Sequence, residues 1–266
     1  MRSTAPGRRS EPHTPPRVEA AETLADATPR VPGSNEPGAS VVIPTWVHVI
    51  TDGQLGASDV AARNQVATLN AAYAGQFGGV DTGVRFRLDG LTRTTNALWF
   101  RDPITNERAI KQMRKGGPET LNLYIAQLSE LVLGYSTYPL WYKDEPKLDG
   151  VVIDWRTLPG GSLRSFDRGF TGVHEIGHWL GLLHTFENGC TSPGDGIADT
   201  SPQGSATDGC VIGKDTCEDD GADPIHNFMD YSDDRCMSEF TAGQALKMQE
   251  TWSTYRSLKA DITLNR

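Results

Sequence analysis

The stretch HEIGHWLGLLH, residues 174–184, has the pattern H-E-x-x-H-x-x-G-x-x-H. On a helix, His174 and His178 are about 40° apart around the axis and about 6 Å apart along it, so both imidazoles can reach one metal ion. Glu175 lies on the same turn, where its carboxylate can accept a proton from a water molecule without being a ligand. Gly181 predicts a positive φ where the chain leaves the helix, and this turn brings His184 to the same ion as a third ligand.

A polar helix face is the alternative interpretation of three histidines. The five fixed positions arise by chance with a probability on the order of 10⁻⁵ over a chain of this composition, and a polar face does not require Glu and Gly at these spacings. The sequence therefore predicts a zinc site on a helix.

Composition narrows the class of protein further. With 266 residues and 37% hydrophobic content, the chain can bury one sizeable core or two small ones. No apolar run has the length of a membrane span. The net charge of −9 argues against a nucleic acid as partner. The negative charge is concentrated in residues 190–236, which contain eleven Asp and Glu but only two basic residues, Lys214 and Arg235.

All four cysteines lie in this acidic segment, at Cys190, Cys210, Cys217 and Cys236. An even number favours disulfides, for which four cysteines allow three pairings. A second zinc site is disfavoured because no two cysteines are spaced C-x₂-C, and a reduced cytosolic set is the other alternative.

Residues 1–40 differ from the rest of the chain. They contain seven of the sixteen prolines and few large apolar side chains. We predict a disordered or propeptide-like segment. It lacks the apolar stretch of a signal peptide, so we expect that a leader was removed or that export uses another route.

Strands are predicted at residues 41–50, 84–88, 121–125 and 151–155 from alternating or continuous apolar side chains. Helices are predicted at 58–75, with Ser58 as N-cap, and from a Thr241/Gln244 capping box through Tyr255. His48 in the first strand is interpreted as a core or supporting residue rather than a ligand. These elements predict an α+β fold with a twisted mixed sheet, a backing helix, the motif helix, and a loop-rich C-terminal part that ends in a helix.

The extended motif resembles that of metzincin proteases, and later residues resemble the pappalysin family within them. The resemblance covers roughly residues 41–258 and is most specific from 170 onward. Its further matches are the segments NFMDYSDDRCM (227–237), GDGIADT (194–200), FTAGQ (240–244) and GVVI (150–153), together with the four cysteines.

This resemblance implies a secreted zinc metalloendopeptidase of proteins or peptides, with a catalytic domain at 41–266 divided into an upper part, 41–181, and a lower part, 182–266. It implies disulfides Cys190–Cys217 and Cys210–Cys236. It also implies that Asp195 and Thr200 bind Ca²⁺ with backbone carbonyls such as that of Ala198, against the alternative of a solvated acidic loop. No feature of the sequence sets the oligomeric state.

Two further roles follow from the resemblance. Met229 is expected to form the hydrophobic floor beneath the zinc, where a packed core methionine is the alternative. Tyr231 is expected near the zinc as a hydrogen-bond donor to the oxyanion, where a packed aromatic is the alternative.

Two other functions stay open at this point: a metzincin of another subfamily, and a zinc-containing binding module without peptidase activity. Ulilysin-like members of the family cut before Arg or Lys, which we attribute to an acidic residue just before the Met-turn cysteine. Here Arg235 precedes Cys236, so we predict a weakened basic preference, with Arg235 pairing Asp233 or Asp234 or facing solvent.

Overall fold

Five strands form one mixed sheet in the order β2-β1-β3-β5-β4. The structure, a computed structural model, describes residues 40–129, 131–218 and 221–257. In chain order its elements are β1 (Val41–Thr51), α2 (Asp59–Tyr73), β2 (Val84–Thr95), α3 (Ala97–Arg101), α4 (Glu107–Ile110), η1 (Lys111–Met113), β3 (Leu121–Ala126), β4 (Gly134–Ser136), η2 (Pro139–Lys143), η3 (Pro146–Leu148), β5 (Val151–Asp154), η4 (Trp155–Thr157), α5 (Phe170–Trp179), α6 (Ala242–Thr251) and η5 (Trp252–Arg256).

The pairing of the strands makes the sheet mixed. β1 lies parallel to β2 and β3, and β3 lies parallel to β5, whereas the edge strand β4 is antiparallel to β5. The predicted α+β fold with a mixed sheet and helices is therefore confirmed.

The two faces of the sheet have separate apolar cores because successive side chains of a strand point to opposite faces. In β3, Leu123 and Ile125 belong to a large core with α2 and α5. Tyr124 and Ala126 belong to a smaller core with Ile50 and Phe100 on the other face. The large core also contains residues from the end of the chain, such as Met248, so it joins the sheet to the C-terminal helix.

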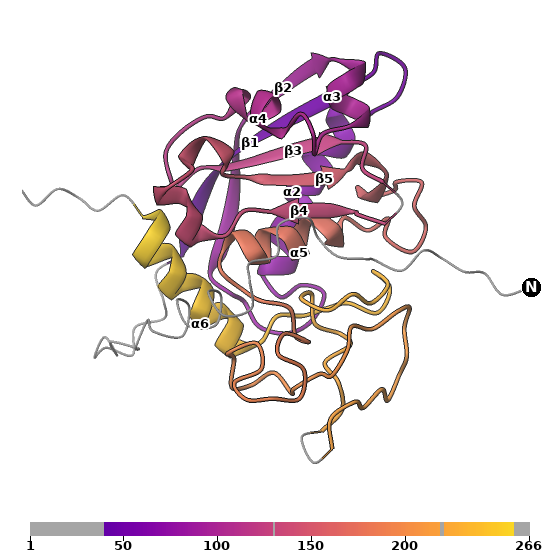
Figure 1. Cartoon of the computed structure of the whole chain (residues 1–266), viewed down its shortest axis with the longest axis vertical. Helices are drawn as coiled ribbons and strands as arrows, with labels where there is room; N and C mark the ends of the chain where they lie inside the picture. Colours follow the sequence, from indigo (N-terminus) through magenta and orange to yellow (C-terminus); the bar gives the residue numbers. More distant parts are fainter. Residues whose placement is uncertain (1–39, 130, 219–220, 258–266) are drawn as a thin grey trace, which may run out of the picture.

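Helices α2 and α5 pack together. The hydroxyl of Tyr73 in α2 donates to the carbonyl of Val173 in α5 at 3.0 Å. The side chain of Gln65 fills the space that a Cβ at Gly172 would occupy, only 2.5 Å from that position. As Figure 1 shows, α5 lies between the sheet and the loops below it. This position places α5 at the boundary between the regular and the irregular parts of the molecule.

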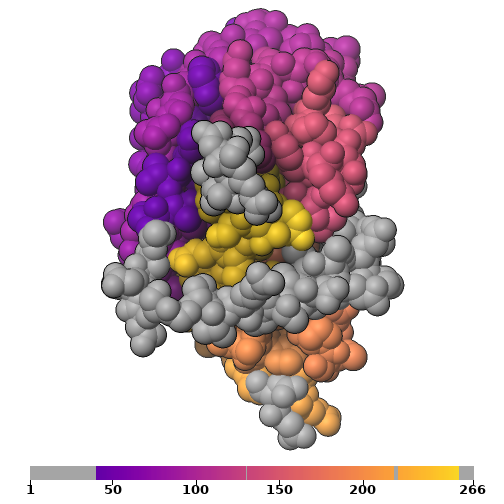
Figure 2. All heavy atoms as spheres, turned by 90° about the vertical axis from the view of Figure 1, so that its left-hand side faces the viewer, coloured from indigo at the N-terminus to yellow at the C-terminus, as the bar shows by residue number. Residues whose placement is uncertain are grey.

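Both predicted helix caps are present. The hydroxyl of Ser58 accepts from Ala61 at 3.1 Å at the start of α2. At the start of α6, Thr241 and Gln244 form the reciprocal capping box. In Figure 2 the yellow residues of this C-terminal helix lie between the sheet residues above and the orange loop residues below.

The structure differs from the sequence-based predictions in two strands. β2 continues to Thr95, well beyond 88, because it pairs with β1 along its whole length through a register shift at Thr45/Trp46. Gly90 permits this strand pairing because it has no side chain; a Cβ there would lie 2.3 Å from the ring of Trp46. β4 was not predicted, since three residues are too few for a periodic pattern.

Residues 182–241 follow α5 and contain no helix or strand in their described part. Two disulfides cross this segment, Cys190–Cys217 and Cys210–Cys236, in the pairing that the family resemblance implies. The division at 181/182 stays a prediction. Apart from its last residue, the predicted segment 1–40 lies outside the described residues. None of the helices described is long and apolar enough to cross a membrane.

Candidate metal centre

Helix α5 is completely buried and carries the first part of the motif. Its N-cap is Gly169, which has a φ of +83° and no side chain to accept from the first turn. Asp234 replaces this cap from far along the chain. Its Oδ2 accepts from the backbone N–H groups of Arg168 at 2.8 Å and Phe170 at 3.4 Å. A carboxylate at this end also compensates the positive end of the helix dipole.

The three motif histidines meet at one point. Nε2 of His178 lies 3.1 Å from Nε2 of His174 and 3.1 Å from Nε2 of His184. All three side chains are buried. Among the described residues, they form the one cluster of three or more His, Cys, Asp or Glu side chains with ligand atoms close enough to hold an ion.

This donor set fits zinc. Zn–N bonds of about 2.0–2.1 Å in a tetrahedral site place two ligand nitrogens about 3.3 Å apart, close to the spacing found here. The opposite ring nitrogens are also oriented. Nδ1 of His174 lies 2.7 Å from the carbonyl of Phe228, and Nδ1 of His178 lies 2.8 Å from that of Leu182. A proton on Nδ1 leaves Nε2 as the lone-pair donor, as metal ligation requires.

Gly181 makes the turn that brings His184 to the cluster. Its φ is +94°, as predicted from the motif. The space beside it is also filled, because a Cβ there would lie 2.7 Å from Thr251 of α6. The C-terminal helix therefore packs directly against the exit of α5.

Glu175 is buried against the edge strand β4. A Cβ at Gly134 would lie 2.6 Å from Cγ of Glu175, so only glycine lets the strand and the carboxylate side chain approach this closely. No pattern in the sequence predicts this role of Gly134, since the two residues lie in separate elements.

Met229 lies under α5. A Cβ at Gly177, the residue before His178, would be 2.4 Å from the Met229 sulfur, so the helix has no side chain where the methionine packs. The carbonyl of Met229 also accepts from Thr185, next to His184, at 3.3 Å. Met229 thus contacts both α5 and the segment that carries His184.

Tyr231 forms part of the wall around the histidines. Its ring centroid lies 4.9 Å from that of His184 and 5.6 Å from that of His174. Phe186 completes this group by stacking on His184 at 4.7 Å. The structure thus brings Tyr231 beside the histidine cluster, and its role as a hydrogen-bond donor to the oxyanion stays a prediction.

Tyr138 was missed by sequence reasoning. Its hydroxyl lies 2.9 Å from Nδ1 of His178, on the side opposite the meeting point. Forty residues separate the two in the chain. A lone tyrosine after a three-residue strand gives no pattern from which this contact could be predicted.

Asp195 and Thr200 also come together, in the acidic segment. The Thr200 hydroxyl lies 2.7 and 2.8 Å from the two carboxylate oxygens of Asp195. Burial is the main cause that raises the pKa of Asp195 to about 7. Calcium binding at these residues stays a prediction.

Arg235 and His48 are not members of the histidine cluster. The Arg235 side chain is 73% exposed and pairs with Asp233 at 3.2 Å. His48 is buried between Thr92 and Asn122, at 2.8 and 3.0 Å from them. Burial lowers the pKa of His48, as expected for a neutral residue of the interior.

Comparisons with known proteins find matches to the part of the chain that contains the three histidines. The peptidase M43 family model, described as pregnancy-associated plasma protein-A, matches residues 121–253. A protein of Verticillium alfalfae named extracellular metalloprotease is 43% identical over 230 residues, which cover 82% of this chain and 78% of that protein. A protein of the same name from Pyricularia oryzae is 42% identical, with coverage of 83% and 78%.

Solved protein structures are also similar to this chain. Mature mirolysin of Tannerella forsythia, in complex with a cleaved peptide, is similar with a TM-score of 0.69 and 27% identity, covering 80% of this chain and 92% of that chain. A promirolysin mutant from T. forsythia has a TM-score of 0.74 and 26% identity, covering 94% and 91%.

Proposed function

The chain belongs to the pappalysin family of metalloproteases, and we propose that it cleaves peptide bonds with a zinc ion held by His174, His178 and His184. The observation that carries this assignment is the meeting of three oriented Nε2 atoms in a buried cluster. A zinc ion held by these three neutral imidazoles would act as a Lewis acid, polarising a carbonyl and making a water molecule a better proton donor near neutral pH.

Glu175 is the proposed general base. It follows a ligand histidine on α5, and its side chain is confined by Gly134. Its carboxylate takes a proton from the attacking water and delivers it to the leaving amine. Burial of Glu175 keeps this proton transfer away from bulk solvent.

Tyr231 is proposed to donate a hydrogen bond to the developing oxyanion. Support comes from its ring, which packs against His174 and His184 beside the cluster. Met229 is the proposed apolar floor of the metal centre, since it is fully buried against Gly177.

The substrates are proposed to be extended segments of proteins or peptides. β4 is the edge strand of the sheet and lies beside Glu175, so an extended peptide can add to this edge by backbone hydrogen bonds. Such pairing would bring the bond to be cut close to the general base.

Secretion and calcium complete the proposal. The relatives named extracellular metalloproteases and the two disulfides support an oxidising, extracellular location. The buried Asp195 carboxylate beside Thr200 supports a Ca²⁺ site, because hard oxygen ligands suit this ion.

The test compares two histidines from the same segment. His184→Ala should lose both zinc and the hydrolysis of an unfolded protein substrate, since the cluster retains only two ligands. His226→Ala removes an exposed histidine outside the cluster and should retain both. Hydrolysis that persists in a zinc-depleted wild type, or in His184→Ala, would contradict the proposal.

A further inference from the structure

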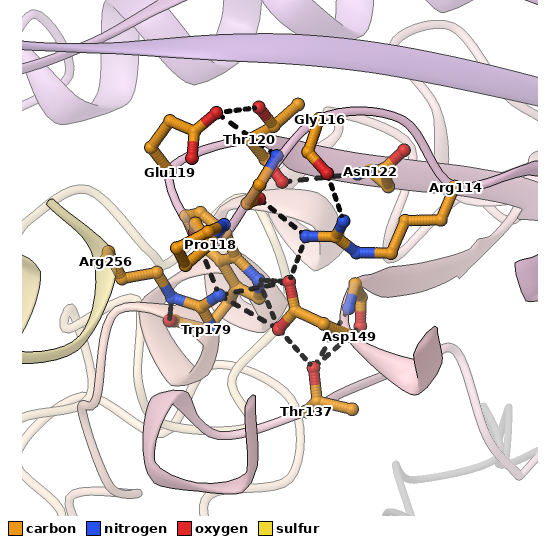
Figure 3. Close-up of polar contacts among 12 residues, drawn as sticks. Arg114, Gly116, Pro118, Glu119, Thr120, Asn122, Thr137, Asp149, Trp179 and Arg256 are labelled. Atoms are coloured by element: carbon orange, nitrogen blue, oxygen red, sulfur yellow. Dashed lines mark hydrogen bonds and ion pairs between the residues drawn. The ribbon is translucent and has the colours of Figure 1, made fainter. Parts of the chain in front are cut away.

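Asp149 is buried between the end of α5 and η5, and it lies 25 residues before the first histidine of the cluster. Four side chains point to its carboxylate, as Figure 3 shows. They are Arg256 at 2.9 and 3.0 Å, Trp179 at 3.1 and 3.2 Å, Thr137 at 3.1 Å and Arg114 at 3.4 Å. A buried carboxylate with this many donors is held in one orientation.

Trp179 connects this carboxylate to the metal centre, because it follows His178 directly and is the last residue of α5. Its indole N–H donates to Asp149, and its carbonyl accepts from Nε of Arg256 at 3.2 Å. The guanidinium of Arg256 also lies over the indole ring, 3.7 Å from its centroid. Trp179 is therefore held through its N–H, its ring face and its carbonyl.

A second connection runs through Thr137. Its hydroxyl donates to Asp149 and accepts from the N–H of Gly150 at 3.0 Å. The next residue, Tyr138, has its hydroxyl 2.9 Å from Nδ1 of His178. Asp149 thus lies where the two segments that border His178 meet.

We propose that Asp149 is a positioning residue for the metal centre: it fixes Trp179 and the Thr137–Tyr138 segment, and through them the imidazole of His178. This rests on the proposed function, since it assigns His178 to a metal ion. Partners behind a metal-ligating histidine set its ring orientation, and their loss typically lowers metal affinity or activity about 10- to 100-fold. Asp149 acts one residue further away on each connection, so we expect the lower end of this range.

Trp179→Phe is the sharpest test, because it removes the indole N–H that donates to Asp149 and keeps the Asp149–Arg256 ion pair and an aromatic ring under Arg256. We expect zinc affinity and kcat each to fall roughly tenfold, with KM unchanged. Zinc affinity is measured by competition with a chelator at a temperature where melting curves show the variant to be folded.

Trp155→Phe is the matched control. The buried indole N–H of Trp155 has no hydrogen-bond partner among the described residues, so the same chemical change should leave zinc affinity and kcat unaltered. Wild-type zinc affinity and kcat in Trp179→Phe would overturn the proposal, as would an equal loss in Trp155→Phe.

Thr137→Val decides the question if Trp179→Phe does not fold. It removes one donor to Asp149 with little change in volume, and lower zinc affinity with unchanged KM is expected; wild-type values would overturn the proposal. Because zinc affinity is measured without substrate, an inactive wild type would refute the proposed function and still leave this measurement able to decide the role of Asp149.

Discussion

Residues 40–181, the sheet half, contain all five strands and helix α5, whereas residues 182–241, the loop half, contain no helix or strand in their described part. The sheet half is held by apolar side chains such as Leu123 and Val173, which are completely buried. The loop half buries the carboxylates of Asp195, Asp230 and Asp234 alongside apolar side chains of the large core such as Phe228, and two disulfides cross it. Each half supplies part of one metal centre, so the site depends on two different sources of stability.

Removing a disulfide should produce the largest difference in stability between the two halves. In the chain-entropy model, the Cys190–Cys217 crosslink, which spans 27 residues, stabilises the fold by about 3.5 kcal/mol. The double variant Cys190→Ala/Cys217→Ala should therefore show faster hydrogen exchange in the loop half, with β1 and β3 nearly unchanged. Mass-spectrometric hydrogen exchange measures both regions in one experiment.

Leu123→Ala is the counterpart in the sheet half. A cavity at this buried leucine destabilises by roughly 2–5 kcal/mol. Because the large core also includes Phe228 and Met229 of the loop half, exchange should rise in both halves. Equal exchange patterns in the Leu123 and cysteine variants would show that the two halves are not stabilised differently.

Patterns of neighbouring residues predicted most of the structural features that lie within a single helix or turn. The Ser58 cap, the Thr241/Gln244 capping box and the positive φ of Gly181 each depend on residues a few positions apart. The contact of Asp149 with Arg256 spans 107 residues, and its chemistry is visible only after folding. The same holds for Asp234 at the start of α5, which repetition or spacing could not reveal.

Calcium should stabilise the loop half by a smaller amount. An ion that binds only the folded state at 100 times its Kd contributes about 2.7 kcal/mol. Millimolar Ca²⁺ should therefore raise the melting temperature of the wild type, and Asp195→Asn should abolish the increase. Asp208→Asn, the same substitution at an exposed position of the acidic segment, should preserve it.

A wild-type melting curve that is the same in calcium and in a calcium-selective chelator would count against this site. Retained stabilisation in Asp195→Asn would instead place the ion elsewhere in the acidic segment.

The smallest expected effect concerns cleavage preference. Arg235 is largely exposed and paired with Asp233, so the position just before Cys236 offers no carboxylate to a basic side chain of the substrate. We expect little enrichment of Arg or Lys directly after the cut. Arg235→Asp should increase kcat/KM for such sites by at most roughly fivefold, because an exposed ion pair contributes about 0.2–1 kcal/mol.

Cleavage profiling on a proteome digest measures this preference for both proteins. Strong enrichment of Arg and Lys after the cut in the wild type, with an unchanged profile in Arg235→Asp, would show that another residue sets the specificity.

The role of Glu175 is tested most directly by Glu175→Gln, measured for zinc content and peptidase rate on the same preparation. The amide occupies nearly the same volume beside Gly134 but cannot accept the proton of the attacking water. The variant should bind zinc like the wild type and lose about 10²–10⁴-fold in kcat. A zinc-loaded Glu175→Gln variant with the wild-type rate would contradict the assignment of Glu175 as the general base.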